Sequence, residues 1–199
     1  MTPGMLADLL GEPPTPDGDW AGEAVYLSAA ALRRRADPVA LAARVPGATA
    51  LASGMIRIVL DEPGEILGAE TPVPDQGWPD FPRTWDNRGF VVRYAHARAA
   101  GVRRWAAELE VPVAPFESAL LSHRLDRAVL RVLAELPGRL VSRDPGWENY
   151  LVRLALAYHD AHEGAPAVPV GDEPVRAVHT ARVRLAEAVQ NVLPGPDNL

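Results

Sequence analysis

The 199 residues of the chain allow one medium domain or two small ones, and an apolar share of 48% is ample for a core. The absence of cysteine excludes a disulfide framework, a thiolate zinc site and a cysteine nucleophile. No run of about 18 apolar residues occurs, and the first residues lack the basic start of a signal peptide. We therefore expect a soluble cytoplasmic protein with no membrane contact.

The net charge of −6 argues against unspecific binding to nucleic acid, but the charge is unevenly distributed. All 20 basic residues are arginine. Residues 1–85 hold 6 arginines against 12 acidic residues, whereas residues 86–199 hold 14 of each. A nucleic-acid surface is therefore expected only as a local patch in the second part of the chain.

The first 62 residues predict a small α+β domain. Residues 1–18 contain a short apolar piece followed by three prolines, which indicates a loose leader. A helix is expected from about Trp20 to Arg35, with an aspartate before it as a cap, and a shorter one over Val39–Arg44. The β-branched run Met55–Leu60 then predicts a strand.

Residues 63–84 are rich in proline and glycine, with Trp78 and Phe81 among them. Proline fixes an extended backbone and blocks helix formation. The segment is therefore interpreted as a linker, or as an arm that lies over the following domain with its aromatic side chains buried.

A proline-free stretch from Phe90 to Glu108 has the period of a helix. At about 100° per residue, its apolar side is expected to hold Val91, Ala95, Val102, Trp105 and Leu109. Its opposite side is expected to hold Arg93, His96, Arg103 and Arg104. Arginines spaced by alanines allow a phosphate backbone to approach, although such a face is as often only a solvated surface. Arg98 projects from the apolar side, so we expect a carboxylate partner for it.

Three further helices are expected, over Ala119–Leu136 with Ser118 as its cap, over Trp147–His162, and from about Pro174 to Leu193. The first of them carries Arg124, Arg127 and Arg131 along one flank. Four amphipathic helices with modest loops predict an all-α bundle over residues 85–199. The whole chain is therefore expected to be mainly α, with the small α+β domain before the bundle.

The hexapeptide Arg-Tyr-Ala-His-Ala-Arg at residues 93–98 resembles the Gln-Tyr-Ala-His-Ala-Arg segment that opens the DALR anticodon-binding domain of arginyl-tRNA synthetases. Residues 128–137, 151–159 and 182–193 resemble later helices of that domain, in the same order. Residues 18–21 and 54–57 are similar to two segments of the synthetases' amino-terminal domain. The resemblance implies a DALR-type bundle joined to that amino-terminal domain, with the arm standing in place of the catalytic domain.

The motifs that synthetases of this class use for adenylation are absent from the sequence. Neither His-x-Gly-His nor Lys-Met-Ser-Lys-Ser occurs, and a chain without lysine cannot form the second. We therefore expect no enzymatic activity, no catalytic residue and no cofactor. His159 and His162 lie three residues apart but lack a third ligand, so structural histidines are favoured over a metal site.

The resemblance implies a catalytically inactive protein that binds tRNA. The candidate RNA-binding residues are Arg93, Tyr94, His96, Arg103, Arg104, Arg124, Arg127 and Arg131. Tyr94 is a candidate to stack on a splayed base, although packing in the core is the commoner fate of such a tyrosine. The alternative is a protein-interaction module, with a synthetase or another protein as partner, that has lost RNA binding. The arginine stripes favour the first interpretation, and the acidic balance favours the second.

Overall fold

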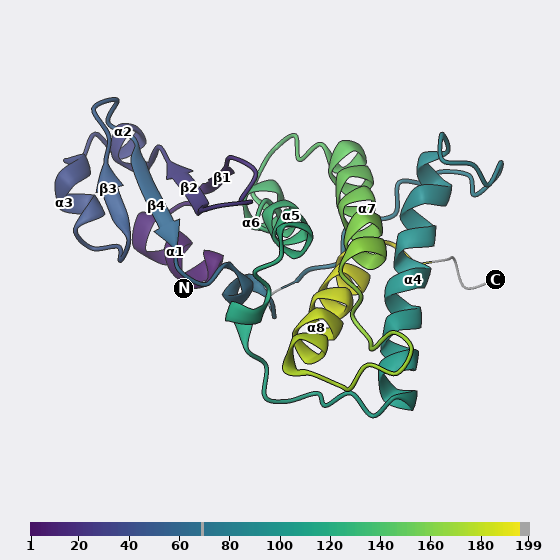
Figure 1. The fold of residues 1–199 in the computed structure, drawn as a ribbon. Helices are drawn as coiled ribbons and strands as arrows, with labels where there is room; N and C mark the ends of the chain where they lie inside the picture. The colour runs from purple at the N-terminus through teal and green to yellow at the C-terminus, as the bar shows by residue number, and fades with distance from the viewer. Residues whose placement is uncertain (69, 196–199) are drawn as a thin grey trace.

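The computed structural model describes residues 1–68 and 70–195. A four-stranded antiparallel sheet with short helices forms one half of the molecule, and a group of longer helices forms the other (Figure 1). About half of the chain is helical, which agrees with the expected mainly-α class.

The sheet half contains most of the short elements of the fold. In chain order these are α1 (Pro3–Leu10), β1 (Thr15–Asp17), β2 (Ala24–Ser28), α2 (Ala30–Arg34), α3 (Pro38–Ala42), β3 (Ala48–Ala50) and β4 (Ile56–Leu60). The strands lie in the order β1-β2-β4-β3. Every second residue of β4 is buried, at Ile56, Ile58 and Leu60, as expected of a sheet with one covered face.

The expected helix over Trp20–Arg35 is wrong, because β2 and the short α2 occupy its place. Trp20 has a positive φ of 63°, which a helix does not allow, and its indole N–H donates to the Val25 carbonyl at 3.0 Å. β2 pairs with β4 along its whole length, from Ala24 opposite Leu60 to Ser28 opposite Ile56. Long-range pairing has thus overridden a local helical pattern.

The expected loose leader is also wrong. Residues 3–10 form α1, which Thr2 caps by accepting a hydrogen bond from the Met5 N–H at 3.3 Å, and Gly11 ends it in the left-handed region. Leu6 and Leu10 are completely buried, so this helix belongs to the core. The helix expected at 39–44 and the strand expected at 55–60 are confirmed within two residues at each end.

Residues 63–87 behave as an arm that lies against the helical half. The segment begins with a 3₁₀ turn, η1 (Pro63–Ile66), and has no regular helix or strand in its described residues after that. Buried Val73 donates its backbone N–H to the Val192 carbonyl at 3.1 Å. The arm interpretation therefore holds, but its aromatic side chains are not all covered, because Phe81 and Trp85 are exposed.

The helical half is built on four principal helices. They are α4 (Arg88–Glu108), α5 (Arg124–Leu133), α7 (Trp147–Gly164) and α8 (Ala177–Val192), with η2 (Ser118–Leu120) and α6 (Leu136–Leu140) as short connections. α7 contacts both α4 and α5, and α4 packs along α8 (Figure 1). The predicted helices corresponding to α4, α7 and α8 are confirmed.

The single helix expected over Ala119–Leu136 is divided in the structure. His123, not Ser118, caps α5, by accepting a hydrogen bond from the Leu125 N–H at 3.4 Å. Ser118 instead donates its hydroxyl to Glu62. Pro137 lies in the first turn of α6, where a missing N–H is harmless, so Pro137 begins a helix where it was expected to stop one.

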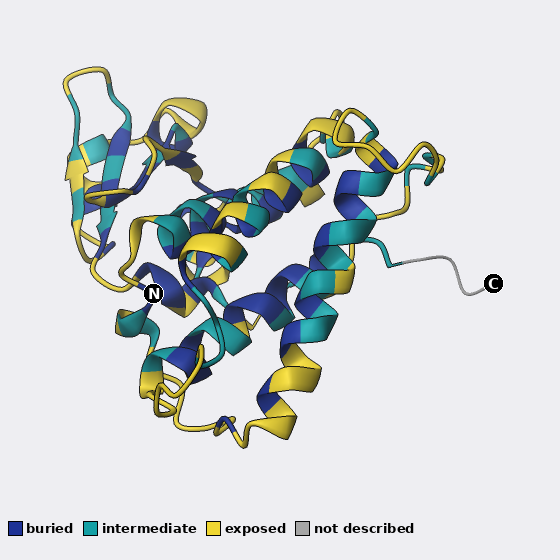
Figure 2. Ribbon diagram, turned by 45° about the vertical axis from the view of Figure 1, so that its right-hand side comes forward, coloured by how far each residue is buried: buried dark blue, intermediate teal, exposed yellow. Residues whose placement is uncertain are grey.

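The two halves share packing. Buried side chains from both belong to one continuous apolar cluster, which includes Trp20 and Tyr26 as well as Leu130 and Leu154. Arg127 of α5 donates to backbone carbonyls of the sheet half as well. The proposed division at residues 62 and 85 is thus crossed by apolar and polar contacts, and Figure 2 shows buried residues running from one half into the other.

Because the core is continuous, we expect Trp20→Ala to destabilise the helical half together with the sheet half. Trp20 is 1% exposed and packs edge-on against Tyr26 at 5.5 Å between ring centroids. The free energy of unfolding should fall by about 3–5 kcal/mol. Urea unfolding followed by far-ultraviolet circular dichroism, which reports mainly the helices, measures it. A helical signal that keeps the parent's midpoint would instead indicate two independent domains.

Candidate nucleic-acid interface

α4 presents one side to the core and the other to solvent. The buried residues of this helix are Gly89, Val91, Val92, Ala95, Ala99, Val102 and Ala106. Trp105 and Leu109 were expected on that side, but Trp105 is 59% exposed and Leu109 is exposed too. The expectation is wrong because the rest of the protein covers only a narrow strip of the last turns of α4, where Val102 and Ala106 are the buried residues (Figure 2).

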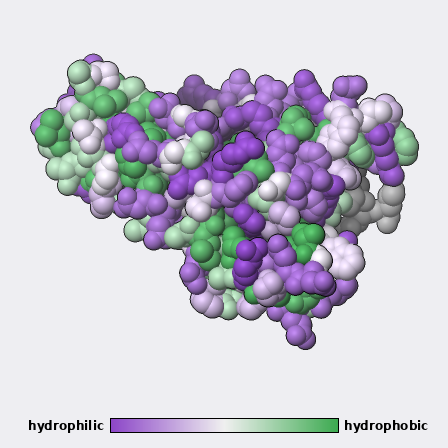
Figure 3. All heavy atoms as spheres, in the orientation of Figure 1, coloured by the Kyte–Doolittle hydropathy of each residue, from purple (hydrophilic) through white to green (hydrophobic). Residues whose placement is uncertain are grey.

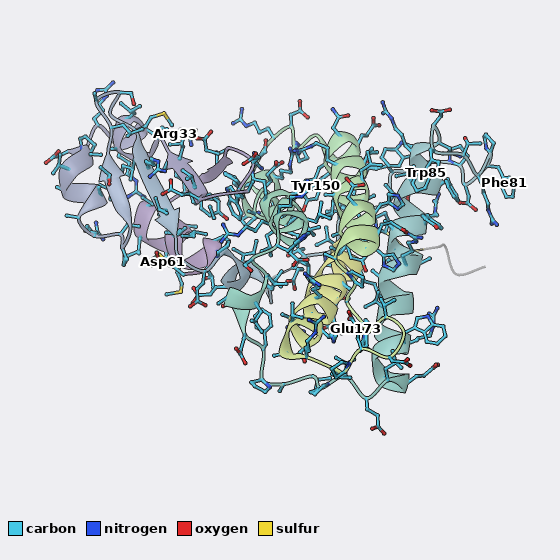
Figure 4. The ribbon with its side chains drawn as sticks, in the orientation of Figure 1. Arg33, Asp61, Phe81, Trp85, Tyr150 and Glu173 are labelled. Atoms are coloured by element: carbon cyan, nitrogen blue, oxygen red, sulfur yellow. The ribbon has the colours of Figure 1, made fainter. Side chains whose placement is uncertain are left out.

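Four rings gather where the arm enters α4, and we call them the aromatic platform: Trp85, Phe90, Tyr94 and His159. Trp85 lies edge-on to Phe90 at 6.1 Å and to Tyr94 at 5.6 Å, and 4.7 Å from His159, between ring centroids. Phe90 stacks on Tyr94 at 5.4 Å. Trp85 is 53% exposed, and Figure 4 shows it at the start of α4, near Phe81.

Arg98 supports this platform from the next turn of α4. Its guanidinium lies 4.8 Å from the centroid of Tyr94 and donates to His159 Nδ1 at 3.1 Å. It also pairs with Glu163, which confirms the expected carboxylate partner. The side chains of Arg98 and Glu163 are 24% and 56% exposed, so the pair lies at the surface. The hydrogen bond from Arg98 lowers the pKa of Glu163.

Arg93 and His96 differ from the remaining residues of the expected basic face. Arg93 donates to the Trp78 carbonyl at 2.7 Å and to Asp75 at 3.3 Å, and its side chain is only 14% exposed. It therefore fastens the arm to α4. The half-buried ring of His96 has a lowered pKa because burial disfavours the imidazolium. A neutral, covered histidine is a poor phosphate contact.

Arg103 and Arg104 are exposed on α4, as expected. Arg103 donates to Gln190 at 3.1 Å, which ties it to α8 without covering it. Trp105, next in the chain, adds an exposed ring. Tyr94 and Trp105 are eleven residues apart, close to three helical turns, so they lie on the same side of α4 about 16 Å from each other.

The arginines of α5 do not extend this surface. Arg124 is exposed, but Arg127 donates to the Gly22 and Trp20 carbonyls, and Arg131 donates to the Gly18 carbonyl at 2.8 Å. Because α7 lies between α5 and α4, the two expected stripes belong to different sides of the molecule. The site is therefore built on α4, the arm, and the part of α7 that carries His159 and Glu163.

His162, the second histidine considered for a metal site, lies next to Tyr158 on α7. His162 lies 6.1 Å from Tyr158 between ring centroids, and its pKa is lowered mainly by burial and further by Arg98. Among residues 1–68 and 70–195, no group of three or more histidine, aspartate or glutamate side chains is arranged to hold a metal ion. No helix in the same residues is both long and apolar enough to cross a membrane.

Part of the chain is similar in sequence to arginine–tRNA ligases. It is 39% identical to that of Clavibacter sepedonicus over 123 residues, which cover 59% of this chain and 22% of the ligase. It is 34% identical to that of Paenarthrobacter aurescens strain TC1 over 113 residues, which cover 54% of this chain and 21% of the ligase. No family model matches the chain. No solved structure matches it either.

These matches support a protein related to arginyl-tRNA synthetases over somewhat more than half of its length. The chain spans about a fifth of the length of the curated relatives that it matches. A continuous match to more than half of the residues must include the middle of the chain, which lies in α4. The helix that carries the candidate interface therefore belongs to the related region.

Because the Arg98–Glu163 pair is exposed, Arg98→Ala should destabilise the protein only modestly. We expect a loss of about 1 kcal/mol, mainly from the contact of the guanidinium with Tyr94. Chemical denaturation of the parent and the variant measures it, with the exposed Arg104→Ala as the matched control, expected within about 0.5 kcal/mol of the parent. A loss several times larger than 1 kcal/mol would show that Arg98 is a buried ion.

Proposed function

We propose that this chain is a catalytically inactive relative of arginyl-tRNA synthetases that binds tRNA through residues 85–199, a DALR anticodon-binding-type domain. The observation that carries the proposal is the aromatic platform, which lies at the start of α4 beside Arg98, on the helix that also carries Arg103 and Arg104. The partial similarity to arginine–tRNA ligases, which includes α4, supports the same conclusion.

The platform suits unpaired bases. Proteins that bind single-stranded RNA stack splayed bases on aromatic rings and guanidinium planes. Trp85 exposes about half of its surface, and its ring lies 6.1 Å from that of Phe90, 5.6 Å from that of Tyr94 and 4.7 Å from that of His159, between centroids. A base that stacks on Trp85 thus meets a ring whose orientation is already fixed, which limits the entropy lost on binding.

The arginines of α4 suit the phosphates that accompany those bases. Arg103 and Arg104 lie nine and ten residues beyond Tyr94. At about 100° per residue, Arg104 is therefore about 80° around the helix from Tyr94, and Arg103 lies on the opposite side of it. Arg88, at the start of the helix, is exposed and paired with Glu148 at 3.2 Å. Because the net charge of the chain is −6, RNA can be attracted only to a small positive surface. This favours one specific binding position over non-specific binding.

Adenylation lies outside the proposed function, because the lysine loop on which it depends cannot occur in a sequence without lysine. The proposed role is therefore recognition alone.

A second candidate function, a protein-interaction module, is favoured by a different surface. Leu109, Val113 and Phe116 are exposed at the end of α4 and in the loop after it. Phe116 also lines a hollow with Met1 and Met5 at the start of α1, and exposed apolar surface of this kind marks protein-binding sites. A synthetase or another protein is the partner in this alternative, which requires no RNA contact.

If α4 contacts phosphates, the double variant Arg103→Ala/Arg104→Ala should bind every RNA more weakly than the parent does. The logarithm of the binding constant should depend less steeply on the logarithm of salt concentration, by about two units, because each lost phosphate contact removes one released counterion. Fluorescence anisotropy with labelled tRNA at several salt concentrations measures both quantities.

The matched control is Arg34→Ala/Arg44→Ala, which removes two exposed arginines from the sheet half. This control should keep the parent's affinity and slope. If both double variants lose the same amount, the effect is one of net charge. If neither loses any, the basic side of α4 is only a solvated surface, and the interaction module becomes the better proposal.

Trp85→Ala should weaken tRNA binding by about 1–3 kcal/mol at every salt concentration, and it should leave the salt slope unchanged. The reason is that stacking releases no counterions. Trp85→Phe, which keeps an aromatic ring, should recover much of the affinity. The same anisotropy titrations measure both variants, and a duplex RNA of equal length serves as the ligand without splayed bases. Equal losses for duplex and tRNA would argue against stacking.

A further inference from the structure

A cleft of about 810 Å³ lies between the sheet half and the helices, away from α4. Its walls are residues 12–16, which lead into β1, Arg33 of α2, the ends of α5 and α6, and the loop and first turns of α7. Figure 3 shows a largely hydrophilic surface where the two halves meet. The size of the cleft falls within the range of small-molecule sites, roughly 300–1,000 Å³.

The lining of the cleft is rich in guanidinium groups. Four arginines line it: Arg33, Arg131, Arg139 and Arg153. Three carboxylates face them: Glu12, Glu135 and Asp144. The cleft thus carries an excess of positive charge in a chain whose net charge is −6.

Glu135 organises three of the arginines around one carboxylate. It accepts hydrogen bonds from Arg131 at 2.6 Å, from Arg139 at 2.7 Å and from Arg153 at 2.5 Å. Burial by itself raises the pKa of Glu135, but the hydrogen bonds from the three guanidinium groups outweigh it and lower that pKa to about 2. The carboxylate is therefore charged at any physiological pH.

A single carboxylate cannot neutralise three guanidinium groups. Glu135 holds them side by side in spite of their mutual repulsion, and a positive excess remains at the cleft. Arg33, which is paired with Glu12 at 2.5 Å and largely exposed, stands on the opposite wall. The hydroxyl of Ser142 and the amide of Asn149 add neutral hydrogen-bonding groups to the lining.

We propose that this cleft binds a small anion that carries two or more phosphate groups. The planar fork of arginine matches phosphate oxygens and gives strong charge-assisted hydrogen bonds. Arginines on opposite walls fit a ligand with charge at both ends, and an anion of this kind supplies the negative charge that the cluster around Glu135 lacks. The inference is independent of RNA binding, because the cleft lies on the other side of α7 from the aromatic platform.

Isothermal titration calorimetry and thermal unfolding of the full chain with inorganic pyrophosphate test the proposal. Sodium chloride of equal ionic strength is the reference, and a chelator removes divalent cations. Pyrophosphate should bind in a saturable manner, and at about 100 times its dissociation constant it should raise the unfolding temperature by roughly 5 °C above the reference.

Two nearly isosteric variants change the charge of the cleft without removing an arginine. Asn149→Asp adds a carboxylate to the lining, at an exposed position in the first turn of α7 where an acidic side chain suits the helix, so the protein should remain folded. It should weaken pyrophosphate binding roughly tenfold. Asp144→Asn removes a carboxylate and should strengthen binding. The control Asn191→Asp makes the same change at an exposed position of α8 and should bind as the parent does.

The proposal is overturned if the parent shows no saturable binding. It is also overturned if Asn149→Asp and Asn191→Asp bind pyrophosphate equally, because the anion then responds to net charge and not to the cleft. The tRNA titrations of the α4 variants are read separately, so failure of either proposal leaves the other intact.

Discussion

The position of α7 between α4 and α5 is the constraint on which the rest of the helical half depends. Tyr150, Leu151, Leu154, Ala155 and Tyr158 of this helix are all buried. At about 100° per residue these positions span one arc of roughly 140° of the helix, which is wider than a single neighbouring helix covers. α4 and α5 supply that cover, and in doing so they direct their polar faces away from each other. The aromatic platform and the arginine cleft are therefore two separate surfaces with one helix behind both.

The spacing of apolar residues correctly predicts a helix or strand where that spacing alone determines the structure. It fails where contacts with a distant segment determine the structure. α4, α7 and α8 are long and free of internal proline, so their apolar stripes are enough to predict these helices from the sequence. The five residues of β2, in contrast, mix the helix formers alanine and leucine with valine and tyrosine, which favour strands, and their pairing with β4, some thirty residues later, makes them a strand. In the same way, α1 is stabilised by its caps, Thr2 and Gly11, and by packing against the core. The prediction of a loose leader took no account of that packing.

The candidate interface is predictable to a similar degree. Helical spacing correctly places Arg103 and Arg104 outside, and the apolar position of Arg98 correctly indicates a carboxylate partner. It does not show that the arm covers Arg93, because Asp75 and Trp78 reach that residue from outside the helix. Helical spacing also does not predict the aromatic platform, because Trp85 and His159 come from segments more than seventy residues apart. Such a contact leaves no periodic signal in either segment.

The exclusive use of arginine has a consequence for control of the two surfaces. Guanidinium groups stay protonated throughout the physiological range, whereas a lysine ammonium loses its charge when it is acetylated and shifts its pKa readily when buried. The positive charge of α4 and of the cleft is thus independent of cellular pH and out of reach of the enzymes that acylate or ubiquitinate lysine side chains. Any regulation of these surfaces has to act through competition for them, or through their carboxylate neighbours.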